Sequence, residues 1–126
     1  TRRQAFLPWL RDGALDIVQP DVTKVGGITE SRRIAWMALD YGVRFIPHGW
    51  NTAVGLAADL QLASAFPETD LIEYLTGSVY IDAITTEPWQ LDADGMLAIP
   101  DLPGLGIELN ADAVYKYSGS RDFLTY

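Results

Sequence analysis

Two residues of this 126-residue sequence combine types and positions that suit proton transfer, Asp21 and His48. Each directly follows a proline at the end of a short strand-like run, and His48 is the only histidine of the sequence. In parallel α/β folds the carboxyl ends of the strands present side chains to ligands. A histidine beside a carboxylate can take up and release protons near neutral pH. This pair is therefore the first candidate for a catalytic site. Taken singly, His48 could be a structural residue and Asp21 a helix or loop cap.

Three apolar strand-like runs predict the elements that would position these side chains. The runs begin at Leu15, Val43 and Leu71, so successive starts are 28 residues apart. Such a period is typical of repeated βα units. Helices are expected before and between the runs, with boundaries set by capping residues, Gly and Pro. They are predicted at about Arg3 to Asp12, from an N-cap at Thr29 to Gly42, and from an N-cap at Asn51 or Thr52 to Pro67.

From about residue 77 the βα period is lost. The segment 87–92 could form a strand, and Asp94-Gly95 predicts a hairpin turn before residues 96–100. We therefore divide the sequence into residues 1–76, which carry the βα units, and residues 77–126, which pack elsewhere. Gly26-Gly27 could be a phosphate-binding pair, but a tight strand-to-helix turn explains these two glycines better.

Composition excludes several classes of function. The net charge is −8, with 9 basic and 17 acidic residues, so nucleic acids and anionic membrane surfaces are unsuitable partners. Asp59 and Gln61 interrupt the best apolar run, which stays below the roughly 18 residues that a membrane span needs. Because there is no cysteine, disulfides and thiolate chemistry are excluded. The sequence does not begin with Met, so we expect the gene product to begin earlier. A cytoplasmic location is expected.

Beyond these patterns, an ordered succession of motifs resembles the C-terminal part of the enolase superfamily, mandelate racemase subgroup. The motifs are Asp16-Ile17-Val18-Gln19-Pro20-Asp21, Lys24, Gly26-Gly27-Ile28-Thr29, Pro47-His48, Ile72-Glu73-Tyr74, and Asp94-Gly95 through Pro100-Asp101-Leu102-Pro103-Gly104-Leu105-Gly106. The resemblance implies an α/β fold: strands six to eight of a modified TIM barrel, plus a C-terminal segment that completes an α+β capping domain. Proteins of this family remove a proton α to a carboxylate and stabilise the product on Mg²⁺.

The resemblance also implies roles for particular residues. His48 would be the general acid/base, and Asp21 would orient its imidazole. Glu73, which could otherwise face solvent or cap a loop, would hydrogen-bond the substrate carboxylate. Trp50 and Asn51 would line the substrate pocket, although Trp50 could equally anchor the loop against the barrel. Lys24 would lie near the sixth-strand loop behind Asp21, although a surface lysine is the default interpretation.

Other parts of the family's site have no counterpart here. The resemblance places the Mg²⁺ ligands and a second base before Thr1, so no metal ligand is expected in this chain, and the 126 residues alone should be inactive. The expected partners are a small carboxylate substrate, the N-terminal remainder of the enzyme and further copies in a homo-oligomer. The first choice of reaction is dehydration of an aldonate or aldarate. Racemisation or epimerisation of a 2-hydroxy acid is the alternative, and a non-catalytic assembly module is the hypothesis outside enzymes.

Overall fold

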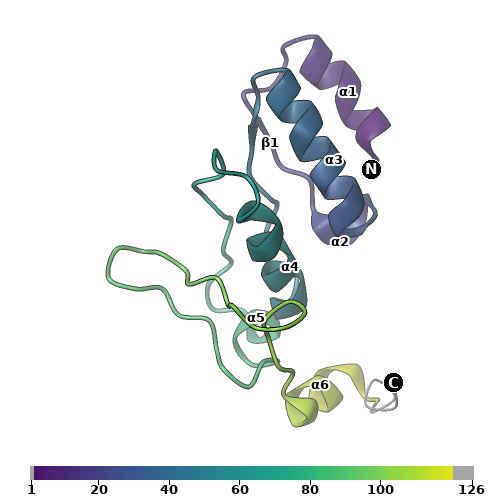
Figure 1. The fold of residues 1–126 in the computed structure, drawn as a ribbon. Helices are drawn as coiled ribbons and strands as arrows, with labels where there is room; N and C mark the ends of the chain where they lie inside the picture. Colours follow the sequence, from purple (N-terminus) through teal and green to yellow (C-terminus); the bar gives the residue numbers. More distant parts are fainter. Residues whose placement is uncertain (1, 121–126) are drawn as a thin grey trace.

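The computed structural model describes residues 2–120 of the chain. Figure 1 shows α1, α3 and the strands at one end of the molecule, α4 in the middle, and α5 and α6 at the other end. The elements, in chain order, are α1 (Arg3–Arg11), β1 (Ile17–Val18), α2 (Val22–Val25), α3 (Gly27–Asp40), β2 (Arg44–Phe45), α4 (Ala53–Ala63), α5 (Val79–Asp82) and α6 (Ala111–Ser118).

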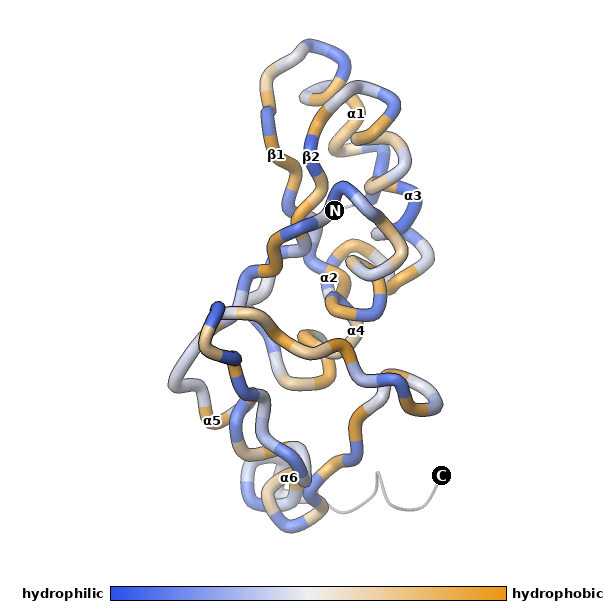
Figure 2. The backbone as a smooth tube through the Cα atoms, turned by 60° about the vertical axis from the view of Figure 1, so that its left-hand side comes forward, coloured by the Kyte–Doolittle hydropathy of each residue, from blue (hydrophilic) through white to orange (hydrophobic). Residues whose placement is uncertain are grey.

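The two strands form a parallel pair joined by α3, as the βα period predicts. Ile17 lies opposite Arg44, and Val18 lies opposite Phe45. Figure 2 shows the two strands side by side. The pairing continues past the strand ends, because the amide of Ile46 donates to the carbonyl of Val18 at 3.2 Å. This extended register controls which residues meet beyond the strands.

The expected third strand at Leu71–Tyr74 is wrong: among residues 2–120 the structure assigns no strand to this segment. The segment is fixed to its neighbours by side chains. The hydroxyl of Thr69 donates to the carbonyl of Phe45 at 3.0 Å, and the carboxylate of Glu73 accepts from the amide of Gly49 at 2.9 Å. Apolar content alone suggested a strand, but a strand also needs a partner for its backbone groups.

The boundaries of α2 and α3 differ from the sequence-based expectation. The short α2 was not predicted, and α3 begins at Gly27, so the expected N-cap at Thr29 is wrong. The reason lies in Gly26 and Gly27, whose φ angles of 117° and 83° are in the left-handed region. They form a tight turn between α2 and α3, where a turn from strand to helix is expected, so α3 begins three residues earlier than a helix capped by Thr29 would. The expected stop near Gly42 is confirmed, since α3 ends at Asp40.

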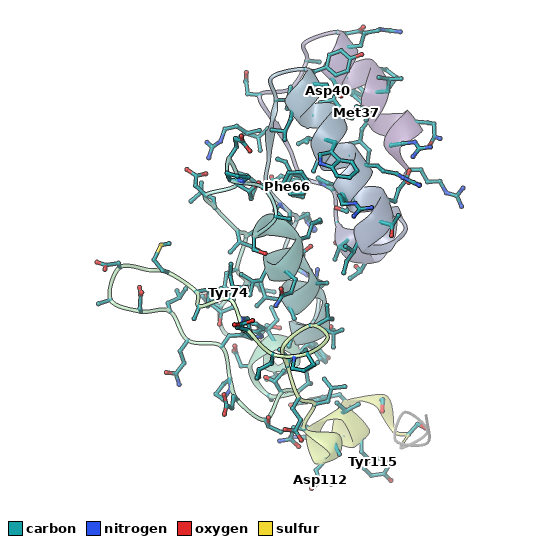
Figure 3. All side chains as sticks on the ribbon, viewed as in Figure 1. Met37, Asp40, Phe66, Tyr74, Asp112 and Tyr115 are labelled. Carbon is teal, nitrogen blue, oxygen red and sulfur yellow. The ribbon has the colours of Figure 1, made fainter. Side chains whose placement is uncertain are left out.

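The helix α4 is the centre of the hydrophobic packing. Nine of its 11 residues are buried. It ends at Ala63, earlier than the Pro67 limit, and Phe66 just beyond it packs against Phe45 with ring centroids 5.5 Å apart (Figure 3). On the other side, Leu56 and Leu60 join a second cluster with Ile81 of α5. Any polar side chain on the buried faces of α4 is therefore withdrawn from solvent.

The described part of the C-terminal segment, residues 77–120, contains little regular structure beyond α5 and α6. The predicted strand at 87–92 is reduced to one antiparallel bridge between Leu91 and Leu97. The expected turn at Asp94-Gly95 is present, and the side chain of Asp92 accepts from the amides of Asp94 and Met96 at 2.9 and 2.8 Å. Gln61 of α4 donates to the carbonyl of Pro100 at 2.9 Å. No helix among the described residues is long and apolar enough to cross a membrane.

Candidate active site

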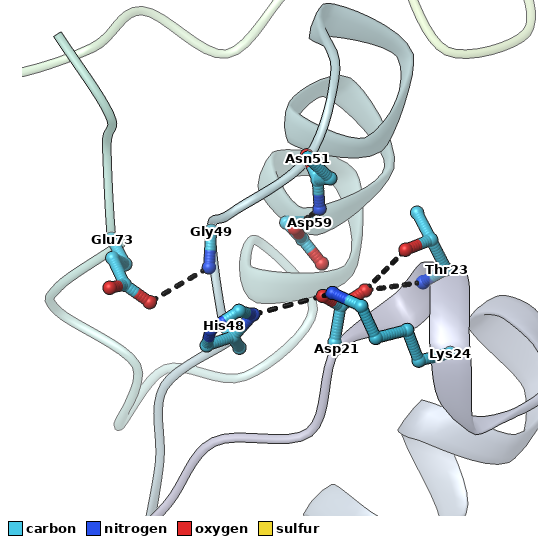
Figure 4. A network of polar contacts seen from close by, with 8 residues as sticks. All are labelled: Asp21, Thr23, Lys24, His48, Gly49, Asn51, Asp59 and Glu73. Carbon is cyan, nitrogen blue, oxygen red and sulfur yellow. Dashed lines mark hydrogen bonds and ion pairs between the residues drawn. The ribbon is translucent and has the colours of Figure 1, made fainter.

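The structure brings Asp21 and His48 into direct contact. His48 Nδ1 lies 2.9 Å from Asp21 Oδ2 (Figure 4). The register of the strands explains this contact, because the amide of His48 donates to the carbonyl of Pro20 at 3.2 Å. That bond continues the β1–β2 pairing by one further step and places the residues after the two prolines next to each other. Parallel pairing of the strands thus brings two side chains that are 27 residues apart in sequence within hydrogen-bonding distance.

Asp21 is both a helix cap and the partner of His48. Its Oδ1 accepts from the amide of Thr23 at 2.9 Å and from the Thr23 hydroxyl at 2.5 Å, which caps α2. Its Oδ2 is contacted by His48 and by the ammonium group of Lys24. The cap of α2 uses Oδ1, and the contact with His48 uses Oδ2. Asp21 can therefore cap the helix and pair with His48 at the same time.

The surroundings of Asp21 keep it ionised. Burial acts to raise its pKa, but hydrogen bonds from Lys24, Thr23 and His48 outweigh burial and lower the pKa to about 2. An ionised carboxylate can only accept hydrogen bonds, so the contact with His48 requires the proton to be on Nδ1. His48 Nε2 is then the nitrogen that can exchange a proton with a substrate. The imidazole is about one third exposed, so it is accessible.

Glu73 is held beside the histidine loop through Gly49. Glu73 Oε2 accepts from the Gly49 amide at 2.9 Å. A Cβ atom at position 49 would lie only 1.9 Å from the backbone oxygen of Glu73, so no other residue allows this approach. The structure therefore places a third ionisable side chain beside the pair of Asp21 and His48 (Figure 4).

The other predicted site residues follow His48 or Asp21. Trp50 is 66% exposed, so it is not packed as a loop anchor against the described residues. Asn51 is turned towards α4, where its Nδ2 lies 3.3 Å from Asp59 Oδ2. Lys24 has an exposed stem and an ammonium group on Asp21, so its contact with the site is indirect. Their roles towards a substrate remain predictions.

Sequence reasoning missed three residues that the structure adds to this cluster: Thr23, Gly49 and Asp59. Thr23 acts through its backbone amide and its hydroxyl, and Gly49 acts through its backbone amide, contacts that no motif around these residues indicated. Asp59 did carry a signal, because it is the one charged residue of an otherwise apolar and neutral helix. We had interpreted it only as an interruption of a possible membrane span. In the structure it is fully buried below Asn51.

The described residues do not provide a Mg²⁺ site. Within residues 2–120, no group of three or more His, Asp or Glu side chains is arranged to hold a metal ion. Both oxygens of Asp21 already accept hydrogen bonds, Glu73 Oε2 is occupied by Gly49, and Asp59 is enclosed in the core. The acidic residues near His48 therefore do not fit the hard-cation coordination that Mg²⁺ requires.

The described part of the chain contains two sizeable cavities. A cavity of about 690 Å³ lies between segments 85–90 and 98–108. A smaller one, of about 390 Å³, lies between the start of α3 and the start of α4. Neither is lined by Asp21, His48 or Glu73. The cluster of Asp21, His48 and Glu73 is therefore not enclosed by either cavity.

Comparison with known proteins identifies the family of this chain. Residues 1–113 match the family described as enolase C-terminal domain-like. The chain belongs to this family. The resemblance to the enolase superfamily and its mandelate racemase subgroup is thus confirmed, as is the α/β class.

Relatives agree on the family while differing in their named activities. The chain is 39% identical over 117 residues to D-galactarolactone cycloisomerase of Agrobacterium fabrum, matching 86% of the chain and 31% of that enzyme. It is 38% identical over 123 residues to D-galactonate dehydratase of Variovorax paradoxus, matching 92% of the chain and 32% of that enzyme.

Among solved structures, a mandelate racemase/muconate lactonizing enzyme from Sulfitobacter has a TM-score of 0.80 at 31% identity. That match covers 97% of the chain and 29% of the solved chain. This chain therefore spans about 30% of the length of the proteins it matches.

Proposed function

We propose that this chain forms one wall of the active site of a sugar-acid dehydratase of the enolase superfamily, acting on an aldonate or aldarate. In this proposal β1 and β2 are the sixth and seventh strands of a modified TIM barrel. The segment after residue 77 completes a capping domain. The observation that carries the proposal is the 2.9 Å contact between His48 Nδ1 and the ionised carboxylate of Asp21. The sugar-acid dehydratases among the relatives support the choice of reaction.

In the proposed reaction His48 acts as the acid. A base outside this chain removes the proton α to the carboxylate, and the electron pair forms a carbon–carbon double bond as the β C–O bond breaks. His48 Nε2 gives its proton to the departing oxygen, which leaves as water. The resulting enol rearranges to a 2-keto-3-deoxy acid. Asp21 stabilises the imidazolium that must exist before this transfer, because its charge faces Nδ1.

Glu73 and the histidine loop would bind the substrate. The Gly49 amide holds one oxygen of Glu73, which leaves the other oxygen to share a proton with the substrate carboxylate in a hydrogen bond. Trp50 and the backbone of Asn51 follow on the same loop and would line the pocket for the polyol chain. The ligands of a Mg²⁺ ion would come from outside residues 2–120, since the described residues do not fit one. The complete enzyme would also supply the partner surfaces for a homo-oligomer.

A racemase or epimerase of 2-hydroxy acids is the second candidate. The structural match to a protein named mandelate racemase/muconate lactonizing enzyme favours it, and the same pair could return a proton to the α carbon on one face. In this version His48 would donate to carbon, no C–O bond would break, and the product would have the mass of the substrate.

The deciding experiment incubates the complete enzyme with a panel of aldonates and aldarates in deuterated buffer and analyses the products by mass spectrometry and NMR. Loss of one water with formation of a 2-keto-3-deoxy acid is expected. A product of unchanged carbon skeleton that carries solvent deuterium and inverted stereochemistry would refute dehydration and support the racemase. An isomer formed by ring opening or closure would instead point to a cycloisomerase.

Two variants and one control connect the reaction to the site. His48→Asn and Asp21→Asn should each abolish turnover while the enzyme stays folded. Asp40→Asn, at an exposed position at the end of α3, removes a carboxylate elsewhere and should not change turnover. The isolated 126-residue chain is expected to be inactive under the same conditions. Activity of the isolated chain, or near-normal turnover of both site variants, would contradict this assignment.

A further inference from the structure

A fully buried carboxylate lies in the middle of α4. Asp59 has 0% exposed surface and is surrounded on its own helix by Ala58, Leu60 and other apolar residues. Buried aspartates are uncommon because removing a carboxyl group from water is costly unless it is paired. A helix whose only task was packing would be expected to carry an apolar residue here.

The surroundings of Asp59 do not compensate this cost fully. Its Oδ2 accepts one hydrogen bond, from Asn51 Nδ2 at 3.3 Å, and within the described residues its Oδ1 has no hydrogen-bond partner. No lysine or arginine contacts it among the ion pairs of residues 2–120. Asp59 is therefore not part of a buried ion pair. Its hydrogen bond from Asn51 is the contact that indicates its role.

The contact is with the loop that carries His48. Asn51 lies three residues after His48, and its side chain packs directly over Gly55. A Cβ atom at position 55 would lie 2.4 Å from the Asn51 amide group. Asn51 is thus clamped between a glycine and a carboxylate of the same helix. The loop is attached to α4 at this point, just before α4 begins at Ala53.

The other end of the same loop makes the contacts of the candidate site. His48 reaches Asp21, and the Gly49 amide reaches Glu73. In the view of Figure 4 the carboxyl group of Asp59 lies between Asn51 and the Asp21–His48 pair. The charges of Asp21 and Glu73 act to raise the pKa of Asp59, and that of His48 acts to lower it. Asp59 itself is enclosed, so it does not touch a substrate in this arrangement.

We propose that Asp59 is a positioning residue of the active site: its hydrogen bond to Asn51 holds the loop 48–52 so that His48 meets Asp21 and Gly49 meets Glu73. The assignment to catalysis rests on the function proposed above. The positioning itself rests only on the contacts described here. Misplacing catalytic groups by about 1 Å costs on the order of 100-fold in rate, so a loosened loop should be visible in kinetics.

Three variants of the complete enzyme test this role. Asp59→Ala removes the acceptor, Asn51→Ala removes the donor, and Asp59→Asn keeps a side chain of the same size with an oxygen that can still accept from Asn51. Leu62→Ala on the same helix is the matched control, because Leu62 packs in the core cluster that contains Phe45 and Phe66 and no residue of the loop 48–52. Activity is expressed per folded enzyme, so loss of stability alone does not count.

Two measurements are made on each variant. Asp59→Ala and Asn51→Ala should lower kcat/KM about 10- to 100-fold, mainly through kcat, and the double variant should be no worse than the more damaged single variant. Asp59→Asn should keep kcat/KM within about threefold, which is too small a change to indicate a displaced catalytic group. Hydrogen–deuterium exchange, followed by mass spectrometry, should accelerate in residues 48–53 for Asp59→Ala, and should not do so for Asp59→Asn or Leu62→Ala.

The outcomes separate this proposal from the proposed function. Unchanged exchange in residues 48–53 of Asp59→Ala would overturn the positioning role, and so would equal damage in Asp59→Asn and Asp59→Ala. The same exchange pattern in Leu62→Ala would reduce Asp59 to a stability residue and also overturn it. If the unaltered enzyme dehydrates no sugar acid, the proposed function fails, while the exchange measurements still decide whether Asp59 holds the loop.

Discussion

Replacing Asp59 by Asn should stabilise the fold, and the gain should grow with pH. Burial is the main cause that raises the pKa of Asp59 from 3.8 to about 7, and the nearby charges of Asp21 and Glu73 add to it. In the unfolded chain the carboxyl group loses its proton near pH 4, whereas in the folded chain it keeps the proton to about pH 7. Between these values the folded state binds more protons, so its stability falls as pH rises.

The size of the effect follows from the two pKa values. A difference of about 3 pKa units corresponds to a loss of about 4 kcal/mol in the free energy of unfolding. This loss is absent below pH 4 and complete above pH 7. An amide does not titrate, so Asp59→Asn avoids this cost. From pH 5 to pH 8 the stability advantage of Asp59→Asn over the unaltered protein should therefore increase by about 3 kcal/mol.

Chemical denaturation at a series of pH values, followed by tryptophan fluorescence, measures this difference. Asp40→Asn serves as the control for removing one carboxylate from an exposed position. A stability difference between Asp59→Asn and the unaltered protein that does not change with pH would refute the reasoning. It would mean that Asp59 titrates alike in the folded and unfolded states, in spite of its complete burial.

Three further predictions concern the contacts around His48. Asp21→Asn should lower turnover at least about 100-fold, because an amide no longer fixes the Nδ1 proton of His48 or stabilises its imidazolium. A smaller loss in steady-state kinetics would contradict the assignment. The lowered pKa of Asp21 gives the unaltered protein about 2 kcal/mol of stability above pH 4, which it loses as the pH falls to 2. Asp21→Asn should lack this contribution at every pH. Acid denaturation curves that coincide for the two proteins would refute this prediction. Gly49→Ala should destabilise the protein by about 1–3 kcal/mol and impair activity, because the new methyl group collides with the backbone of Glu73. A crystal structure of this variant with Glu73 unmoved would contradict the prediction.

The sequence predicted those parts of the structure that depend on local patterns. The period of 28 residues located both strands and the helix between them, and the two prolines located Asp21 and His48 at the strand ends. Their contact followed from parallel pairing alone. The segment 71–74 shows the limit of this approach, because its apolar residues suit a strand, while the assignment of a strand depends on where a partner lies.

The parts that sequence reasoning missed are close approaches between segments. Gly49 looked like an ordinary loop residue, yet the backbone of Glu73, 24 positions away in sequence, leaves no room for a side chain. Gly55 looked like a small helix residue, yet the amide group of Asn51 occupies the space of its missing Cβ atom. Neither requirement leaves a trace in hydropathy or periodicity, because each depends on the position of a single distant atom.

Asp21 and Asp59 show how this fold sets two carboxyl groups to opposite states within one small region. Both are buried, and burial by itself would raise the pKa of each. The number of donors makes the difference: Asp21 accepts from Thr23, Lys24 and His48, whereas Asp59, among residues 2–120, accepts only from Asn51. Asp21 is therefore ionised and can support an imidazolium, while Asp59 holds its proton up to about pH 7. A second negative charge close to the pair would compete with Asp21 for the proton of His48, so a neutral Asp59 preserves the one-to-one pairing that the proposed acid catalysis needs.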